Sequence, residues 1–295
     1  MLTSSALRLS RYEDGTIRRR MPAFIRHSSA TMIVGFFLTL TVVLMAILAP
    51  WLMPYDPNAV TATVRLAGPS PEHWMGSDRY GRDVFSRFLI GSQVSVLVGF
   101  ISMTSVLIVG TIVGVLAGYV GGKLDMVVGR LVDVLLALPG ILLAVAILAV
   151  LGPGLVNVCL AVAISQLPVM IRVVRGATLA VRQRQFVRAA GAIGATHLRI
   201  MTRHVLPYVL GIAAIQMTLG FADAVLYEAA LSYLGIGVQP PEATWGNMIS
   251  EAQSVLTVQP WNAIFPGLGL IMLLLGVNFL GDGLRDILDR EGQGR

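Results

Sequence analysis

The chain has 295 residues, of which 55% are apolar and only 13% are charged, and its mean hydropathy is +0.76. Soluble domains carry roughly 25% charged residues, so this composition excludes a soluble globular protein and a disordered chain and indicates an all-α polytopic membrane protein. The single cysteine excludes a disulfide framework and a thiolate metal cluster, and four scattered histidines do not favour a metal site.

The chain begins with an arginine-rich segment, residues 1–29, which we expect to be a cytoplasmic N-terminal tail. Residues 30–52 are free of charge and long enough for a bilayer core, which takes about 20 apolar helical residues. This stretch is longer than the apolar region of a signal peptide, and no small-x-small cleavage site follows it. It is therefore predicted to remain as the first transmembrane anchor helix.

An external segment, residues 53–90, is expected to follow. It contains two short runs of turn-forming and charged residues, and Ser77 or Asp78 is the predicted N-cap of a short helix that runs through Phe88. We interpret the segment as a structural cap over the external end of the spans, with direct contact to a solute as the alternative. The candidate functional residues of this segment are Gly76, Asp78, Gly81, Arg82 and Asp83.

Residues 91–284 are predicted to form a core of five further spans. The stretch 134–171 contains no charge and is too long for one crossing, and Gly152-Pro153-Gly154 divides it in two. Pro139 and Pro168 are expected to kink the two resulting spans. The expected crossings are 94–119, 131–151, 155–172, 208–231 and 262–280, followed by a cytoplasmic C-terminal tail at 285–295.

The basic residues indicate how the six spans are oriented. Eighteen of the 22 lysines and arginines fall in the two tails, the segment between spans two and three, and the segment between spans four and five. Because cytoplasmic loops are enriched in basic residues, both ends of the chain are predicted to lie inside the cell. The net charge of +6 is then explained by topology, without a nucleic-acid partner.

The internal loop 173–207 is longer than a tight connection between two helices requires. Ala189 and Ala190 begin a small-residue surface that another protein could approach closely, and Gly194 is predicted to end a short helix in the left-handed conformation. Pro207 suits the first turn of span five. A basic loop that only touches lipid headgroups is the alternative. The external loop 235–261 has no basic residue and is predicted to form a short helix at the membrane surface.

The internal loop resembles the cytoplasmic signature loop of ABC importer permeases. That pattern is Glu-Ala-Ala, three residues, Gly, nine residues, and then a segment that ends in Leu-Pro. The matching residues here are Ala189, Ala190, Gly194, His204, Leu206 and Pro207. The chain departs from the pattern at one point, because Arg188 stands where the family has Glu. We hypothesise that a partner ATPase carries compensating acidic character at this point.

Further segments resemble the dipeptide/oligopeptide/nickel permeases, and within that family the C-type, or second, permease subunit. They lie at 73–83, 233–241, 245–246 and 278–286, in the order found in that family. The resemblance implies the type I ABC importer transmembrane fold and a location in the bacterial inner membrane. It also implies that the signature loop forms a coupling helix docked on an ATPase.

The resemblance implies a subunit that is not itself an enzyme. Its expected partners are a second homologous permease, two ATP-binding subunits, an external solute-binding protein and the lipid membrane. The chain has no phosphate-binding G-x-x-x-x-G-K-[ST] of its own, so no cofactor is expected on it, and ATP and Mg²⁺ belong to the partners. Dipeptides and oligopeptides are the expected solutes, with glutathione, a nickel complex or an opine-like compound as alternatives.

Two acids, Asp223 and Glu228, lie within span five. An acid at the centre of a membrane helix costs about 2.5–3.5 kcal/mol on insertion scales, so both are expected to face a cavity or a partner. We predict that Asp223 lines the transport pathway and that Glu228 lies near the external gate. Pairing with another helix or with the second permease is the alternative. Asp133, at the internal end of span three, is interpreted as an ordinary interfacial acid.

Two other functional classes remain to be weighed. An ion-driven secondary transporter could use Asp223 as its ion site, but such proteins have internal repeats and more spans, and no repeat is evident here. A membrane-embedded hydrolase would need a nucleophile–base pair or a metal, and the sequence has neither H-E-x-x-H nor G-x-S-x-G.

Overall fold

The computed structural model describes residues 30–293, with side chains up to residue 287. The predicted N-terminal tail, residues 1–29, lies outside the described residues, whereas residues 285–293 of the predicted C-terminal tail form the end of the last helix. The described part is helical and contains no β-strand. Its long helices are α2 (Ala30–Leu52), α3 (Val84–Val120), α4 (Gly122–Leu136), α5 (Gly140–Leu151), α6 (Leu155–Arg182), α9 (Leu206–Tyr233) and α11 (Trp261–Gln293).

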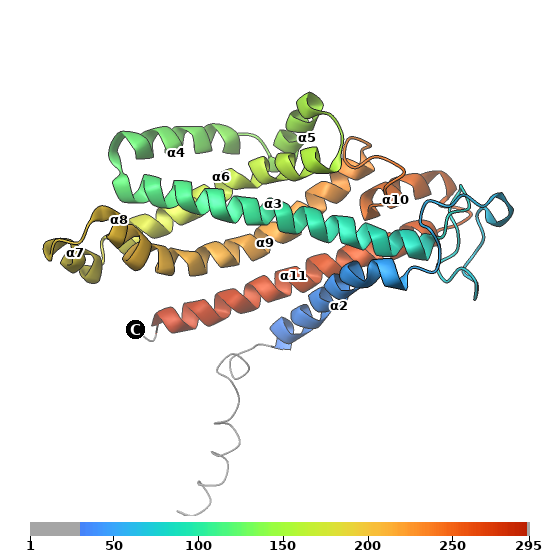
Figure 1. Ribbon diagram of the computed structural model, residues 1–295, viewed down its shortest axis with the longest axis horizontal. Coiled ribbons are helices and arrows are strands. Elements are labelled where there is room, and N and C mark those ends of the chain that lie inside the picture. The colour runs from blue at the N-terminus through green and yellow to red at the C-terminus, as the bar shows by residue number, and fades with distance from the viewer. Residues whose placement is uncertain (1–29, 294–295) are drawn as a thin grey trace, which may run out of the picture.

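The helices form a bundle whose connections gather at two opposite ends (Figure 1). Five helices are long and apolar enough to cross a membrane, and α4 with α5 makes a sixth, bent crossing. In Figure 1, α7 and α8 lie at one end, whereas α10 and the segment before α3 lie at the other. The six-span architecture predicted from the sequence is confirmed, and the first span has the predicted bounds.

The second span corrects two predictions. Helix α3 begins at Val84 rather than near residue 94, so it includes the last part of the predicted external segment 53–90. Its N-cap is Asp83, neither Ser77 nor Asp78, because the Asp83 carboxylate accepts a hydrogen bond of 2.7 Å from the Ser86 N–H. The expected short helix is thus the first part of a helix of 37 residues.

The third span is broken rather than continuous over 131–151. Helices α4 and α5 meet at an angle of 90°. Pro139 precedes α5 and lacks the N–H that would continue a helix. Helix α4 starts at Gly122, so it includes residues that were predicted to form the loop between spans two and three. Pro168, by contrast, lies inside α6 without ending it.

The charges of α4 are stabilised by α6, which continues to Arg182 and so includes the start of the predicted loop 173–207. An oxygen of Asp125 lies 2.7 Å from Nη2 of Arg175, and Oδ1 of Asp133 lies 2.7 Å from Nη2 of Arg172. Asp133, which we interpreted as an ordinary interfacial acid, is exposed and forms an inter-helix ion pair.

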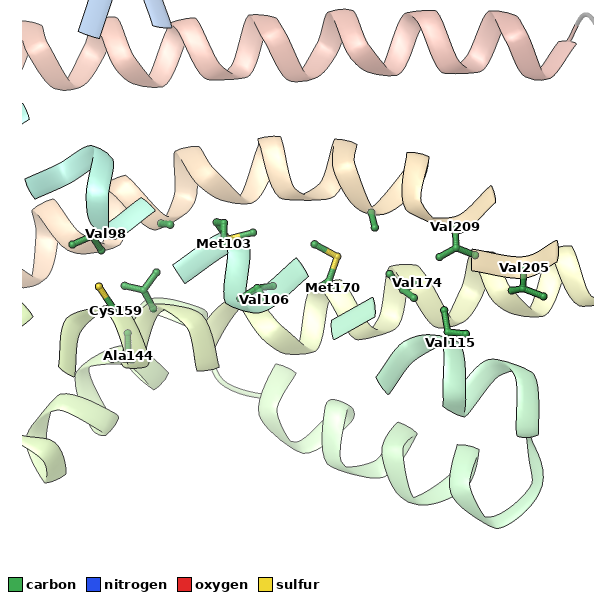
Figure 2. Packing of buried hydrophobic residues seen from close by; sticks show 14 of the residues in the cluster. Val98, Met103, Val106, Val115, Ala144, Cys159, Met170, Val174, Val205 and Val209 are labelled. Carbon is green, nitrogen blue, oxygen red and sulfur yellow. The ribbon is translucent and has the colours of Figure 1, made fainter. Parts of the chain in front are cut away.

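The core lies where α3, α6 and α9 pack together (Figure 2). Met170 and Val174 of α6 lie against α3, whereas Met103 of α3 reaches Gly220 of α9, and these three large side chains are almost fully buried. A Cβ at Gly114 would lie 2.6 Å from Cγ1 of Val174. Small residues let α3 and α6 approach closely, as is usual between membrane helices.

Candidate functional site

The internal loop folds into two short helices, α7 (Gln185–Ala192) and α8 (His197–Ile200), and a π-helical turn, Met201–Val205, leads into α9. Gly194 has φ +83°, a conformation that side chains disfavour. The N–H of Ala195 bonds to the Ala190 carbonyl at 3.1 Å, and the N–H of Gly194 to that of Gly191 at 3.0 Å. This is the Schellman pattern, so Gly194 ends α7 as the sequence predicted.

One face of α7 is fixed to the bundle. Val187 and Ala190 are buried in the main core. The ring of Phe186 stacks on Tyr208 in the first turn of α9, with 5.2 Å between the ring centres. Ala190 therefore points inward and does not contribute to an exposed surface, which corrects the interpretation of the two adjacent alanines as one surface.

The opposite face of α7 and the turn after it are exposed. We call this exposed set the coupling surface, and Ile193 is its most exposed apolar member at 86%. Its members are the exposed small and apolar residues of α7, of the turn after it and of α8, together with one arginine: Arg188, Ala189, Gly191, Ala192, Ile193 and Leu198. Thr196, His197 and Arg199 are exposed beside them. Residues 173–207 contain no acid, and Arg188 has no ion-pair partner in the described part of the chain. The coupling surface therefore suits a protein partner that supplies an apolar groove with acidic character.

The remaining signature residues connect the loop to the spans. His204 and Leu206 are half-buried, and Pro207 lies in the first turn of α9 as predicted. The structure adds a link that no sequence pattern indicated: the Tyr119 hydroxyl, at the end of α3, lies 3.0 Å from Nδ1 of His197. The loop is thus connected to both α3 and α9.

At the other end of the bundle, residues 53–83 and α10 (Trp245–Ala252) form what we call the external cap. Asp83 accepts hydrogen bonds from the Ser86 hydroxyl at 2.7 Å and contacts Nδ1 of His73 at 2.8 Å. Gly81 has φ +80°, and a Cβ there would lie 2.0 Å from the Thr61 carbonyl oxygen. Gly76 is similarly constrained, with φ +78°.

A buried cluster of four charges joins the two parts of the external cap. Arg82 contacts both Asp78 and Glu251 of α10. Arg87 is 1% exposed, and its guanidinium lies 3.8 Å from Asp78 and 3.7 Å from Glu251. Asp78 also accepts the backbone N–H groups of Tyr80 and Arg82 at 2.8 and 2.9 Å. The charged residues of this segment thus hold the cap together.

Helix α10 packs into the bundle and does not simply lie at the membrane surface. The Trp245 side chain is fully buried, and its indole N–H donates to the Phe88 carbonyl at 3.0 Å. A Cβ on Gly246 would lie 2.2 Å from the carbonyl oxygen of Ala229 in α9. The external loop is therefore a packing element between α3 and α9.

The two acids of span five have different surroundings. Glu228 is fully buried and accepts hydrogen bonds from the hydroxyls of Ser95 and Ser232, each at 2.9 Å. Asp223 lies on the exposed side of α9. The structure does not bring these acids together. The surroundings of Glu228 agree with the structural alternative, whereas Asp223 stays a pathway prediction.

No group of three or more metal-ligating side chains occurs within the part of the chain that the structure describes.

Comparisons with known proteins identify two matching families. Residues 110–291 match the family described as the binding-protein-dependent transport system inner membrane component. Residues 23–69 match the N-terminal transmembrane domain of oligopeptide transport permease C. The two matches fall on the helix core and on the first span.

Individual relatives cover most of the chain. The dipeptide transport system permease protein DppC of Alkalihalophilus pseudofirmus is 44% identical over 257 residues, which are 87% of this chain and 84% of the relative. The glutathione transport system permease proteins GsiD of Shigella flexneri and Escherichia coli are 42% identical over 270 residues, or 91% of this chain and 89% of the relatives.

Proposed function

The chain belongs to the family of binding-protein-dependent inner-membrane transport components, and we propose that it is the C-type permease subunit of an ATP-driven importer of dipeptides and oligopeptides. It is a multi-pass protein of the inner membrane and forms part of the transport pathway. The relatives support this substrate class, since one is a dipeptide permease. Glutathione is a second candidate, because other relatives are glutathione permeases and glutathione is itself a tripeptide.

In this proposal the chain works with a second homologous permease, two ATP-binding subunits and an external solute-binding protein. ATP and Mg²⁺ are held by the ATP-binding subunits. The observation that carries the proposal is the coupling surface, which presents small and apolar residues at the internal end of the bundle while its helix stays anchored. Such a surface allows a partner's groove to close around α7.

The anchors of the loop suggest how docking moves the spans. Phe186 ties α7 to Tyr208 at the start of α9, and His197 ties α8 to Tyr119 at the end of α3. When ATP brings the two ATP-binding subunits together, a displacement of α7 is passed to α3 and α9. These helices also carry Asp223 and, at their external ends, the contacts to α10. Movement at the coupling surface thereby changes access to the pathway.

The proposal is tested by purifying the tagged chain in mild detergent and identifying the co-purifying proteins by mass spectrometry. We expect a second permease and the ATP-binding subunits. Ala189→Trp, which places a large ring on the coupling surface, should remove the ATP-binding subunits while the second permease remains. Ala62→Trp is the matched control, because Ala62 is an exposed alanine of the external cap. Recovery of the chain without any ATP-binding subunit would refute the proposal.

A further inference from the structure

The break in the third span leaves the start of α5 uncapped. Pro139 is the N-cap residue and offers no side-chain hydrogen bond. The first bond of the helix joins the Leu143 N–H to the Pro139 carbonyl at 3.1 Å. The N–H groups of Gly140, Ile141 and Leu142 have no hydrogen-bond partner among residues 30–293. The first N–H groups of a helix carry partial positive charge, so this end of α5 attracts an anionic group.

The start of α5 faces α9. The Tyr227 hydroxyl oxygen lies 2.6 Å from the position that a Cβ of Gly140 would take, so the ring fits there only because residue 140 is glycine. Asp223 precedes Tyr227 by four residues, and residues at this spacing are neighbours on one helix face. The unpaired N–H groups, the phenol and the carboxylate are therefore close neighbours.

Asp223 has its own neighbour on α6. The Gln166 side chain interacts with the Asp223 carboxyl group. Gln166 is only 6% exposed, yet its Nε2 atom has no hydrogen-bond partner in the described part of the chain. A buried amide donor without a partner is uncommon, because losing its bond to water costs about 1–3 kcal/mol. The place beside Asp223 thus holds a buried amide donor that makes no hydrogen bond of ordinary geometry among the described residues.

The position of Asp223 argues against lipid contact. It is exposed on α9 and lies about 15 Å from the external end of the helix, at about 1.5 Å of rise per residue. Exposed acids within a span face a water-filled path or another subunit, since lipid disfavours the charge. Irregular backbone such as the break before α5 likewise occurs at membrane depth only where it is covered by protein or lines a cavity.

We propose that the start of α5 and Asp223 form a binding site within the membrane for a solute that carries both an ammonium and a carboxylate group, as a short unblocked peptide does. The inference rests on the proposed function. Asp223 binds the ammonium group, and the N–H groups of Gly140, Ile141 and Leu142 bind the carboxylate. Tyr227 and Gln166 add hydrogen bonds between and beside them.

A dipeptide carries an ammonium group at one end and a carboxylate at the other, so it offers one group to Asp223 and one to the start of α5. A solute with only one of the two charges would satisfy only half of the site.

The site is tested without the solute-binding protein, whose own selectivity would obscure it. The purified complex of both permeases and the ATP-binding subunits is mixed with alanyl-alanine, its N-acetyl derivative or its C-terminal amide. Saturation-transfer NMR detects the bound peptide in the nucleotide-free and the vanadate-trapped complex. We expect a signal from alanyl-alanine that is at least tenfold stronger than that from either blocked peptide.

Asp223→Asn should abolish this preference for the free ammonium group and Asp223→Glu should restore it. Asp133→Asn, which removes an exposed acid on α4, is the control and should leave the preference unchanged.

ATP-driven uptake by the full importer separates this inference from the proposed function. If wild-type uptake is absent, the proposed function fails. If uptake is present but the blocked and free peptides bind equally, or alanyl-alanine gives no signal in either state of the complex, the binding site is refuted while the function stands. An equal loss of all three peptides in Asp223→Asn would also refute it, since that result indicates a general structural role.

Discussion

Replacing Glu251 with alanine should destabilise the external cap more than any surface change there. Glu251 contacts Arg82 and lies 3.7 Å from the guanidinium of Arg87. Without it, two buried arginines share Asp78 as their only carboxylate in the cluster. Removing one partner of a buried ion pair costs about 3–5 kcal/mol, because the other charge stays buried without compensation.

The expected magnitude lies at the lower end of that range. The Glu251 side chain is 14% exposed, so water can partly replace it, whereas Arg87 is only 1% exposed. We expect a loss of about 3 kcal/mol, which corresponds to a fall in Tm of about 6–12 °C for a chain of this size. Glu72→Ala, an exposed acid in the same segment, should change stability by less than about 0.5 kcal/mol.

The assay is thermal unfolding of the purified complex in detergent, followed by tryptophan fluorescence. The charge explanation is tested by adding Arg87→Met to Glu251→Ala, because methionine removes the guanidinium that has lost its partner. The double variant should be at least about 1 kcal/mol more stable than the sum of the single effects predicts. The double variant should regain only part of the lost stability, since Arg87 also donates hydrogen bonds to the Pro57 and Pro241 carbonyls. A Glu251→Ala protein as stable as Glu72→Ala, or strictly additive effects, would refute the reasoning.

Three further outcomes are expected. Arg188→Glu should lower ATP-driven uptake by about tenfold, because repulsion from an acidic partner surface would weaken docking by about 1.4 kcal/mol. Unchanged uptake would refute the hypothesis that the partner ATPase is acidic at this point. Gly246→Ala should lower the Tm of the complex, because overpacking costs about 1–3 kcal/mol and the added Cβ would lie 2.2 Å from a backbone oxygen; Gly68→Ala, with open space around it, is the control. Glu228→Gln should keep stability and transport, because an amide oxygen still accepts a hydrogen bond from Ser95. Glu228→Ala should lower the stability by about 1–3 kcal/mol. Equal damage from both variants would contradict a structural role of Glu228.

The sequence predicted the number of spans, the bounds of the first span and the end of α7 at Gly194. These features depend on local properties: the length of apolar stretches and the conformational freedom of one glycine. The predicted start of α3 was wrong because Arg87, a charged residue, lies just before the charge-free stretch. Its charge is compensated by Asp78 and Glu251, so the helix continues through it.

The other differences have the same origin in contacts between distant residues. Asp125 appeared to lie in a loop, but its partner Arg175 on α6 stabilises it within a helix. Pro139 was expected to produce a kink, whereas the chain turns by 90° there. No sequence pattern indicated the contact between Glu251 and Arg82, because the two residues are separated by 169 positions in the sequence. A single sequence does not reveal such pairs.

The most direct test of the central claim is uptake of a radiolabelled dipeptide into proteoliposomes. These contain the chain, its partner permease and the ATP-binding subunits, and the binding protein is supplied on the accessible external side. ATP is enclosed and ionophores remove all ion gradients. The proposed function predicts accumulation that requires ATP and the binding protein and that is lost in Ala189→Trp. Uptake that needs no ATP and stops when the ionophores are added would contradict it and would instead make Asp223 the site of ion coupling.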